Sequence, residues 1–306
     1  MNIFKRLRFL ISNIIDIQSR LHKIQESLGR IEGRQLRLES HLGESDFDTK
    51  KSEFRVFSQW GEDGIIQALL KYVRIERKIF VEFGVQNYTE SNTRFLLIND
   101  HWSGLLIDGD KNHVDYIKND PIYWQHNLKV DCSFITKDNI NSILMSNGIS
   151  GEIGLLSIDI DGNDYWVWEH ISVISPTIVV IEYNARFGPE RSVTVPYSPD
   201  FTREKAHFSG IYYGASLKAL CTLGHSKGYS FVGTNAAGNN AFFVKKDLMK
   251  LPLKELEVLD GFTKSQFRES RDKKGALQFL SFDDEFNLLY SLDLVDLENL
   301  DSRIED

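Results

Sequence analysis

Five short apolar runs, separated by segments of helical length, constrain the fold of this chain more than any other feature. The runs are 78–84, 104–108, 127–131, 153–159 and 177–182. Such runs are typical of strands buried on both faces, and with helices between them they favour a parallel, doubly wound sheet. Two more runs, 229–233 and 240–245, are joined by a short Gly/Asn turn, which predicts an antiparallel hairpin. We therefore expect an α/β fold with seven strands.

A carboxylate stands at or near the end of each of the five parallel runs. The five are Glu82, Asp108, Asp131, Asp159 and Glu182. Ligands of open α/β sheets bind beyond the carboxyl ends of the strands, so side chains at these ends converge on one pocket. We therefore expect one ligand-binding pocket at this edge of the sheet.

The loop after the first strand narrows the choice of ligand. It reads Gly84-Val85-Gln86-Asn87-Tyr88, whereas a dinucleotide pyrophosphate needs the closely spaced glycines of GxGxxG. A single glycine beside a carboxylate favours a cationic group over phosphate. Asp108 could accept hydrogen bonds from two ribose hydroxyls, and Asp131 from the adenine amine. A cationic adenine nucleoside without phosphate is S-adenosylmethionine (SAM), which we predict as the cofactor.

Four segments resemble the FkbM-type methyltransferases. They are 58–63 (SQWGED), 81–84 (VEFG), 102–108 (WSGLLID) and 157–162 (SIDIDG). The similarity spans residues 55–246. It implies a Rossmann-like, seven-stranded class I methyltransferase sheet and a SAM-dependent O-methyltransferase, of a kind often encoded with bacterial polysaccharide pathways. The family commonly carries Asp-x-Gly-Ala-Asn-x-Gly after strand one, and this chain lacks the second glycine of that motif.

The resemblance also implies roles for individual side chains. Glu82 and Gly84 would line the methionine part of SAM, and Asp108 would hold the ribose. Asp131 and Cys132 would lie near the adenine. Two residues would close over the cofactor from the N-terminal side: Gln59 and Glu62.

Methyl transfer to a hydroxyl needs an acceptor oxygen in line with the methyl group and a base that removes its proton. We predict that Asp161 or His207 is that base. His207 lies in the connection 185–213, which is too long for a plain loop and is typical of a lid over an acceptor site.

A metal ion could assist the same step. Asp161, Glu182 and Asn184 offer hard oxygen ligands that could hold Mg²⁺, and the ion would lower the pKa of a sugar diol. In the alternative interpretation Asp159 faces the cofactor and the other side chains form ordinary loop hydrogen bonds.

Aromatic and arginine side chains near the lid suggest the acceptor. The aromatic residues are Trp166, Trp168, Tyr197, Phe201, Tyr212 and Tyr213. Sugar rings stack on such faces, so we expect a sugar or glycan acceptor. Arg186, Arg191 and Arg203 would suit an acceptor that carries a nucleotide or lipid diphosphate. The alternative is that these arginines belong to a solvated loop.

The N-terminal segment has a different period. Apolar residues recur at alternate spacings of four and three at positions 10, 14, 17, 21, 24, 28, 31, 38 and 42, and Gln35 takes the seam position between 31 and 38. This a/d seam, sustained for more than four heptads, predicts a coiled coil over 8–43 and a homo-oligomer, with parallel trimers or tetramers favoured. The alternative is an amphipathic helix lying on its own domain.

The chain divides into a coiled-coil segment (1–45), a polar linker, a SAM-binding domain (54–250) and a C-terminal segment (251–306) of peripheral helices with an acidic tail. Lys5, Arg6 and Arg8, interleaved with apolar residues, could touch an anionic membrane surface.

Charge and cysteine content limit the partners and the compartment. The formal net charge is -8, and no basic stripe runs through the main body, which argues against a nucleic-acid substrate. The two cysteines, Cys132 and Cys221, form no CxxC motif and indicate a reducing compartment. No run approaches the roughly 20 apolar residues of a transmembrane helix. We expect a cytoplasmic protein, at most peripheral at the inner face of the membrane.

Two other classes stay open at this point. One is a nucleotide-sugar reductase or epimerase, which the missing GxGxxG and the lack of a YxxxK pair disfavour. The other is a non-catalytic coiled-coil scaffold with a vestigial SAM pocket, which the complete set of strand-end acids disfavours.

Overall fold

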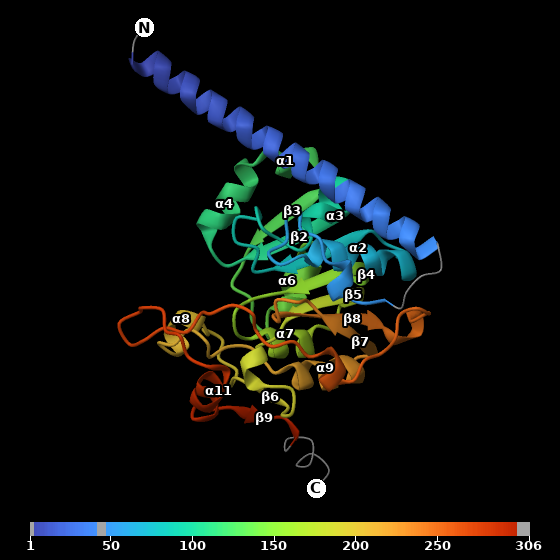
Figure 1. The fold of residues 1–306 in the computed structure, drawn as a ribbon, viewed down its shortest axis with the longest axis vertical. Helices are drawn as coiled ribbons and strands as arrows, with labels where there is room; N and C mark the ends of the chain where they lie inside the picture. The colour runs from blue at the N-terminus through green and yellow to red at the C-terminus, as the bar shows by residue number, and fades with distance from the viewer. Residues whose placement is uncertain (1–2, 42–46, 299–306) are drawn as a thin grey trace.

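The centre of the molecule is a seven-stranded sheet with strand order β3-β2-β1-β4-β5-β8-β7 (Figure 1). The computed structural model describes residues 3–41 and 47–298. Neighbouring strands pair in parallel from β3 to β5, while β8 runs antiparallel to both β5 and β7. This arrangement confirms the predicted Rossmann-like sheet of seven strands, mostly parallel and closed by a C-terminal antiparallel hairpin.

The strands coincide with the predicted apolar runs to within a few residues. Their bounds are β1 (Ile79–Phe83), β2 (Ser103–Asp108), β3 (Leu128–Cys132), β4 (Gly151–Ile158), β5 (Ile174–Glu182), β7 (Tyr229–Thr234) and β8 (Asn240–Lys245). A separate two-stranded sheet joins β6 (Val193–Thr194) to β9 (Val295–Asp296).

Helices cover both faces of the large sheet, as a doubly wound fold requires. On one face lie α2 (Glu62–Tyr72), α3 (Arg94–Asn99), α4 (Lys111–Asn119) and α5 (Pro121–Gln125). On the other lie α6 (Ile140–Ser146), α7 (Asp164–His170) and α9 (Leu217–Ser226). The buried apolar residues therefore form two large clusters, one on each side of the sheet.

The C-terminal segment is less helical than the sequence suggests. Up to residue 298 it contains α10 (Val258–Gly261), α11 (Phe282–Tyr290) and β9, with irregular chain between them. It packs on the lid 185–213, which holds η2 (Ala185–Phe187), β6 and α8 (Arg203–Ala206) (Figure 1). The acidic tail at 299–306 lies outside the described residues. Two short 3-10 turns complete the structure, η1 (Lys50–Ser52) and η3 (Lys246–Leu248).

The predicted N-terminal helix is present as α1 (Ile3–His41), 39 residues long. It crosses the molecule above α2 and α3, and its N-terminal half projects beyond them (Figure 1). Leu42, the last seam position, lies outside the described residues. Within the described ranges, no helix is both long and apolar enough to span a bilayer.

Candidate functional site

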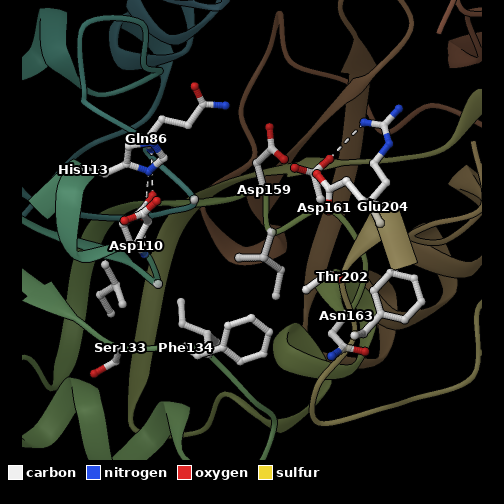
Figure 2. Close-up of a pocket in the computed structure, with 18 of the residues that line it drawn as sticks. Gln86, Asp110, His113, Ser133, Phe134, Asp159, Asp161, Asn163, Thr202 and Glu204 are labelled. Carbon is white, nitrogen blue, oxygen red and sulfur yellow. Dashed lines mark hydrogen bonds and ion pairs between the residues drawn. The ribbon is translucent and has the colours of Figure 1, made fainter. Parts of the chain in front are cut away.

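A cavity of about 530 Å³ opens at the carboxyl ends of β1 to β4, where the sequence predicts the ligand pocket. We call it the strand-end cavity. Its wall includes Asp108 after β2, Phe134 after β3, Asp159 after β4, and Phe201 and Arg203 from the lid. Its volume is within the range of small-molecule sites, about 300–1,000 Å³. Figure 2 shows Gln86 and His113 on one side of it, Asp159 and Asp161 on the other, and Phe134 in the lower part of the view.

Asp108 organises the wall at the end of β2. Its side chain is buried, and one oxygen accepts a hydrogen bond from the Gln86 backbone N–H at 2.8 Å. The other oxygen accepts from the Asp110 N–H at 2.8 Å and lies 3.1 Å from His113 Nδ1. A carboxylate has about four acceptor positions, so one stays available for a ribose hydroxyl.

His113 was not predicted as a site residue. It lies in the first turn of α4, five residues after Asp108, and lines the strand-end cavity. Its position at the start of a helix that follows a strand-end acid is the signal that could have identified it, because such helices begin at the ligand crevice.

Gly84 brings the loop after β1 against the end of β4. Its φ is +69°, and a Cβ atom built there would lie 1.7 Å from the backbone oxygen of Asp159. Only glycine fits both conditions without displacement.

Tyr88 occupies the position of the missing second glycine in the loop motif. Its φ is +62°, so it adopts the left-handed conformation that a glycine would take more easily. The ring is fully buried, its hydroxyl lies 3.1 Å from Thr93 Oγ1, and Arg94 Nη1 donates to its carbonyl at 2.8 Å. The loop therefore keeps its left-handed turn without a glycine at this position, because the contacts of Tyr88 with Thr93 and Arg94 stabilise that conformation.

Glu82 holds the same loop from within. Its carboxylate accepts from the Ser91 hydroxyl at 2.6 Å, from the Asn92 N–H at 2.9 Å, and from Thr93. Burial raises the pKa of Glu82, and these hydrogen bonds oppose the rise. Glu82 also lines a smaller cavity of about 320 Å³, the loop cavity, together with Gln59. Gly84, Gln86 and Asp159 line both cavities, so the two adjoin at the Gly84 loop, where the methionine part of SAM was predicted.

Glu62, in contrast, lines neither cavity. It is fully buried, and its Oε1 accepts from Asn235 Nδ2 at 2.7 Å and from Asn240 Nδ2 at 2.9 Å. It therefore ties the start of α2 to the β7–β8 hairpin. The next residue, Asp63, accepts three backbone N–H bonds at 2.7–2.8 Å from 56–58. The two acids of the SQWGED segment thus shape the wall behind Gln59.

The end of β3 differs from the prediction. Asp131 accepts from Ser133 Oγ and, at 2.7 Å, from Asn147 Nδ2, and the Cys132 side chain is exposed. Neither lines the strand-end cavity; Ser133 and Phe134 line it instead. The reason is that the strand continues to Cys132, so the turn that reaches the cavity begins one residue later.

Three carboxylates gather where β4 and β5 end. Asp159, Asp161 and Glu182 each offer an oxygen atom, and these atoms lie within 4.8 Å of one another. Burial, together with the neighbouring carboxylates, raises the pKa of Asp159 and of Glu182 well above their usual ranges. Glu182 Oε2 is buried and makes no hydrogen bond within the described chain. Asp161 has a φ of +54°, which is uncommon for a residue with a side chain.

Asn184 does not join this group. Its Nδ2 donates to the carbonyls of Ile211 at 2.8 Å and Tyr213 at 3.0 Å, and its Oδ1 accepts from the Arg186 N–H. The side chain is fully buried and fixes the lid to the end of β5. Of the three side chains predicted to hold a metal, Asp161 and Glu182 lie together, with Asp159 beside them, and Asn184 lies apart.

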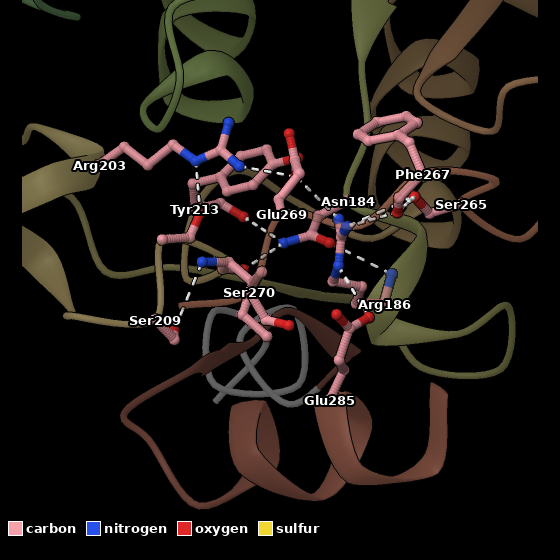
Figure 3. Close-up of polar contacts among 12 residues, drawn as sticks. Asn184, Arg186, Arg203, Ser209, Tyr213, Ser265, Phe267, Glu269, Ser270 and Glu285 are labelled. Atoms are coloured by element: carbon pink, nitrogen blue, oxygen red, sulfur yellow. Dashed lines mark hydrogen bonds and ion pairs between the residues drawn. The ribbon is translucent and has the colours of Figure 1, made fainter. Parts of the chain in front are cut away.

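Arg203 forms the boundary between the strand-end cavity and a third cavity. Its Nη1 lies 3.0 Å from Asp161 Oδ1 and its Nη2 lies 2.7 Å from Glu269 Oε2, while the guanidinium covers the Tyr213 ring at 4.0 Å (Figure 3). The third cavity, the lid cavity, measures about 660 Å³. Asp161 and Arg203 line both cavities.

His207, the other candidate base, faces the lid cavity together with Asp161. Its Nδ1 lies 2.7 Å from Ser209 Oγ. Burial and the positive charge of Lys273 lower the pKa of His207, which favours the neutral ring that a base requires. The structure thus brings both predicted bases to one cavity.

Two of the three arginines predicted to bind a diphosphate are anchors. Arg186 is almost fully buried and pairs with Glu285 at 2.9 Å and Glu269 at 3.2 Å (Figure 3). Arg191 pairs with Asp296 at 3.0 Å. The arginines that line the lid cavity besides Arg203 come from the C-terminal segment: Arg268 and Arg271.

The aromatic residues predicted near the acceptor also lie in different places. Trp168 and Tyr213 are buried in the structure, and Trp166 Nε1 donates to the Val195 carbonyl at 2.9 Å. Phe201 lines the strand-end cavity. Phe208, which was not singled out, lines the lid cavity.

No family model matches this chain, and no curated protein matches it. Several solved structures are similar in part. The N-terminal domain of EvdMO1 with SAH bound has 8% identity and a TM-score of 0.39 over 60% of this chain and 79% of that one. A SAM-dependent methyltransferase from Clostridium acetobutylicum has 9% identity and a TM-score of 0.39 over 69% and 97%.

An O-methyltransferase family protein from Burkholderia thailandensis has 9% identity and a TM-score of 0.36 over 68% of this chain and 60% of that chain. The strand order and register of the sheet define the fold of this chain, and the FkbM-type resemblance stays a prediction.

Proposed function

We propose that this protein binds SAM in the strand-end and loop cavities and transfers its methyl group to an acceptor in the lid cavity. The observation that carries the proposal is the buried Asp108 at the end of β2, which faces a cavity built from the ends of four parallel strands. An acid at that place suits a ribose, and the single tight glycine beside Glu82 leaves no phosphate-binding loop. Phe134 supplies an apolar face for the adenine.

Titration calorimetry of the full chain with SAM tests the cofactor. We expect Asp108→Ala to weaken SAM binding about 10- to 100-fold, because it removes a charged hydrogen-bond acceptor, typically worth about 1.5–3 kcal/mol. Asp283→Ala is the matched control, since Asp283 is exposed in the first turn of α11 and does not line the strand-end cavity. Binding of NADH in place of SAM, or equal SAM affinity in the two variants, would contradict the proposal.

The acceptor in this proposal is a hydroxyl of a sugar or glycan, with a nucleotide or lipid diphosphate at its anionic end. The support is that four residues suited to such an acceptor line the lid cavity: Asp161, His207, Phe208 and Arg268. Either base would take the hydroxyl proton as the oxygen bonds to the methyl carbon, while the bond from that carbon to the SAM sulfur breaks and leaves a neutral thioether. The link to surface-polysaccharide assembly rests on the FkbM-type resemblance alone.

Mg²⁺ is a further part of the proposal. Asp159, Asp161 and Glu182 would hold it, and their hard oxygen donors suit that ion. The buried Glu182 Oε2, without a hydrogen bond in the described chain, fits a cation at this point. When bound, the ion would lower the pKa of the acceptor hydroxyl.

Calorimetric titration with Mg²⁺, without any acceptor, tests this site. We expect Glu182→Gln to weaken Mg²⁺ binding by at least about tenfold, since even outer partners of metal ligands change affinity by that amount. Glu204→Gln is the control, because Glu204 lines the same cavity outside the three-carboxylate group. Absence of Mg²⁺ binding to the unsubstituted protein would exclude the metal and leave Asp161 and His207 as the bases.

A further inference from the structure

Helix α1 carries an exposed apolar seam along most of its length. Eight seam residues are between 54% and 64% exposed: Leu10, Ile14, Ile17, Leu21, Ile24, Leu28, Ile31 and Leu38. The seam covers 29 residues, or about 42 Å at 1.5 Å per residue. Large aliphatic side chains aligned this way in water are typical of an interaction surface.

The body of the protein binds a different face of the same helix. Gly29 and Gly33 are buried, and a Cβ atom at Gly29 would lie 2.3 Å from Val56 Cγ2. Arg30 Nε donates to Asn99 Oδ1 at 3.0 Å. With Leu10 at heptad position d, these residues take positions b, f and c, on the outer side of a coiled coil. Docking on the body therefore leaves the a/d seam uncovered, even where the helix touches α2 and α3.

A second copy of this chain is the partner that fits the seam. The spacing of seam residues, sustained for four heptads, matches only a helix of the same period and comparable length. In the described ranges no other helix exceeds the 11 residues of α2, so the chain does not cover its own seam. In a parallel pair of these helices, the g position Arg34 and the following e position, Glu39, carry opposite charges, as in other coiled coils.

We propose that α1 forms a coiled coil with the α1 helices of other copies through its a/d seam, while its glycine face holds each catalytic domain against the outside of the coil. Leucine predominates at a and isoleucine at d, a combination that favours more than two strands in parallel coils. The proposal does not depend on the identity of the cofactor or the acceptor.

The oligomeric state of the full chain in light scattering after gel filtration tests the proposal. We expect a mass of at least two copies of the 35.3 kDa chain. Ile24→Asp should shift it to a single copy, because it places a charge at d in the middle of the seam. Lys23→Asp is the matched control, because it introduces an aspartate at the preceding residue, in an exposed c position outside the seam. The mass of this variant should equal that of the unsubstituted chain.

A third variant separates the two faces of the helix. Gly29→Ala should loosen α1 from the body, seen as faster hydrogen exchange at the contact with Val56, while the oligomer keeps its mass. Equal thermal unfolding midpoints of the domain in Ile24→Asp and Lys23→Asp would show that neither change acts through misfolding.

Two outcomes would overturn the proposal: the unsubstituted chain runs as a single copy, or the Ile24→Asp variant keeps the full mass. In the first case, flotation with anionic phosphatidylserine vesicles tests whether the single copy binds a membrane through Leu7 and Phe9, both exposed near basic residues. Binding to the vesicles would assign the apolar face to a membrane surface instead.

Discussion

Replacing Gly84 by alanine should lower the free energy of unfolding by about 2–5 kcal/mol and abolish SAM binding. Two costs add at this position. A left-handed φ of +69° costs a residue with a side chain about 1–2 kcal/mol, and forcing a methyl group into a packed region costs about 1–3 kcal/mol more. The new Cβ would lie 1.7 Å from the backbone oxygen of Asp159, so the ends of β1 and β4 would have to separate.

Gly151→Ala is the matched control for this prediction. Gly151 has the same φ of +69°, but no atom lies within 4 Å of a Cβ built there, and it stands at the start of β4, away from the site. The free energy of unfolding of Gly151→Ala should fall only by the cost of the left-handed φ, about 1–2 kcal/mol. Urea denaturation measures both variants. Equal losses would mean that the close approach of Gly84 to Asp159 does not hold the cavity together.

The sequence was sufficient to predict the sheet and the edge that carries the site. Runs buried on both faces fix the strands, because only a parallel sheet between helices hides such runs. The acids at the strand ends then converge by topology alone, and Asp108, Asp159 and Glu182 do lie at that edge. No knowledge of side-chain partners is needed for this level of description.

Partners from distant segments were not predictable in the same way. Glu62 meets Asn235 and Asn240 across more than 170 positions, and Asn184 meets the backbone of the lid. A strand end places a side chain near an edge, but the choice between solvent, cavity and a distant amide depends on how the loops pack. For the same reason, because β3 ends one residue later than predicted, Ser133 lines the cavity where Asp131 was expected.

The sequence predicts the same role for Arg186 and Arg191, whereas in the structure the two side chains differ in burial. Arg186 is 1% exposed, and its ion pairs join the lid to α11 and to Glu269. Arg191 is 49% exposed, and it pairs with the partly exposed Asp296 at the β6–β9 sheet. The two ion pairs should therefore contribute differently to the free energy of unfolding, although both link the lid to the C-terminal segment.

Arg186→Met should lower the free energy of unfolding by about 3–5 kcal/mol, because it leaves the buried carboxylate of Glu285 without its cation. Arg191→Met should cost less than about 1 kcal/mol, since an exposed ion pair is screened by water. Urea denaturation measures both, and SAM affinity should be unchanged in each. If Arg186→Met instead kept its stability and lost only the binding of a diphosphate-bearing acceptor, the residue would belong to the acceptor site, and the C-terminal segment would need another anchor.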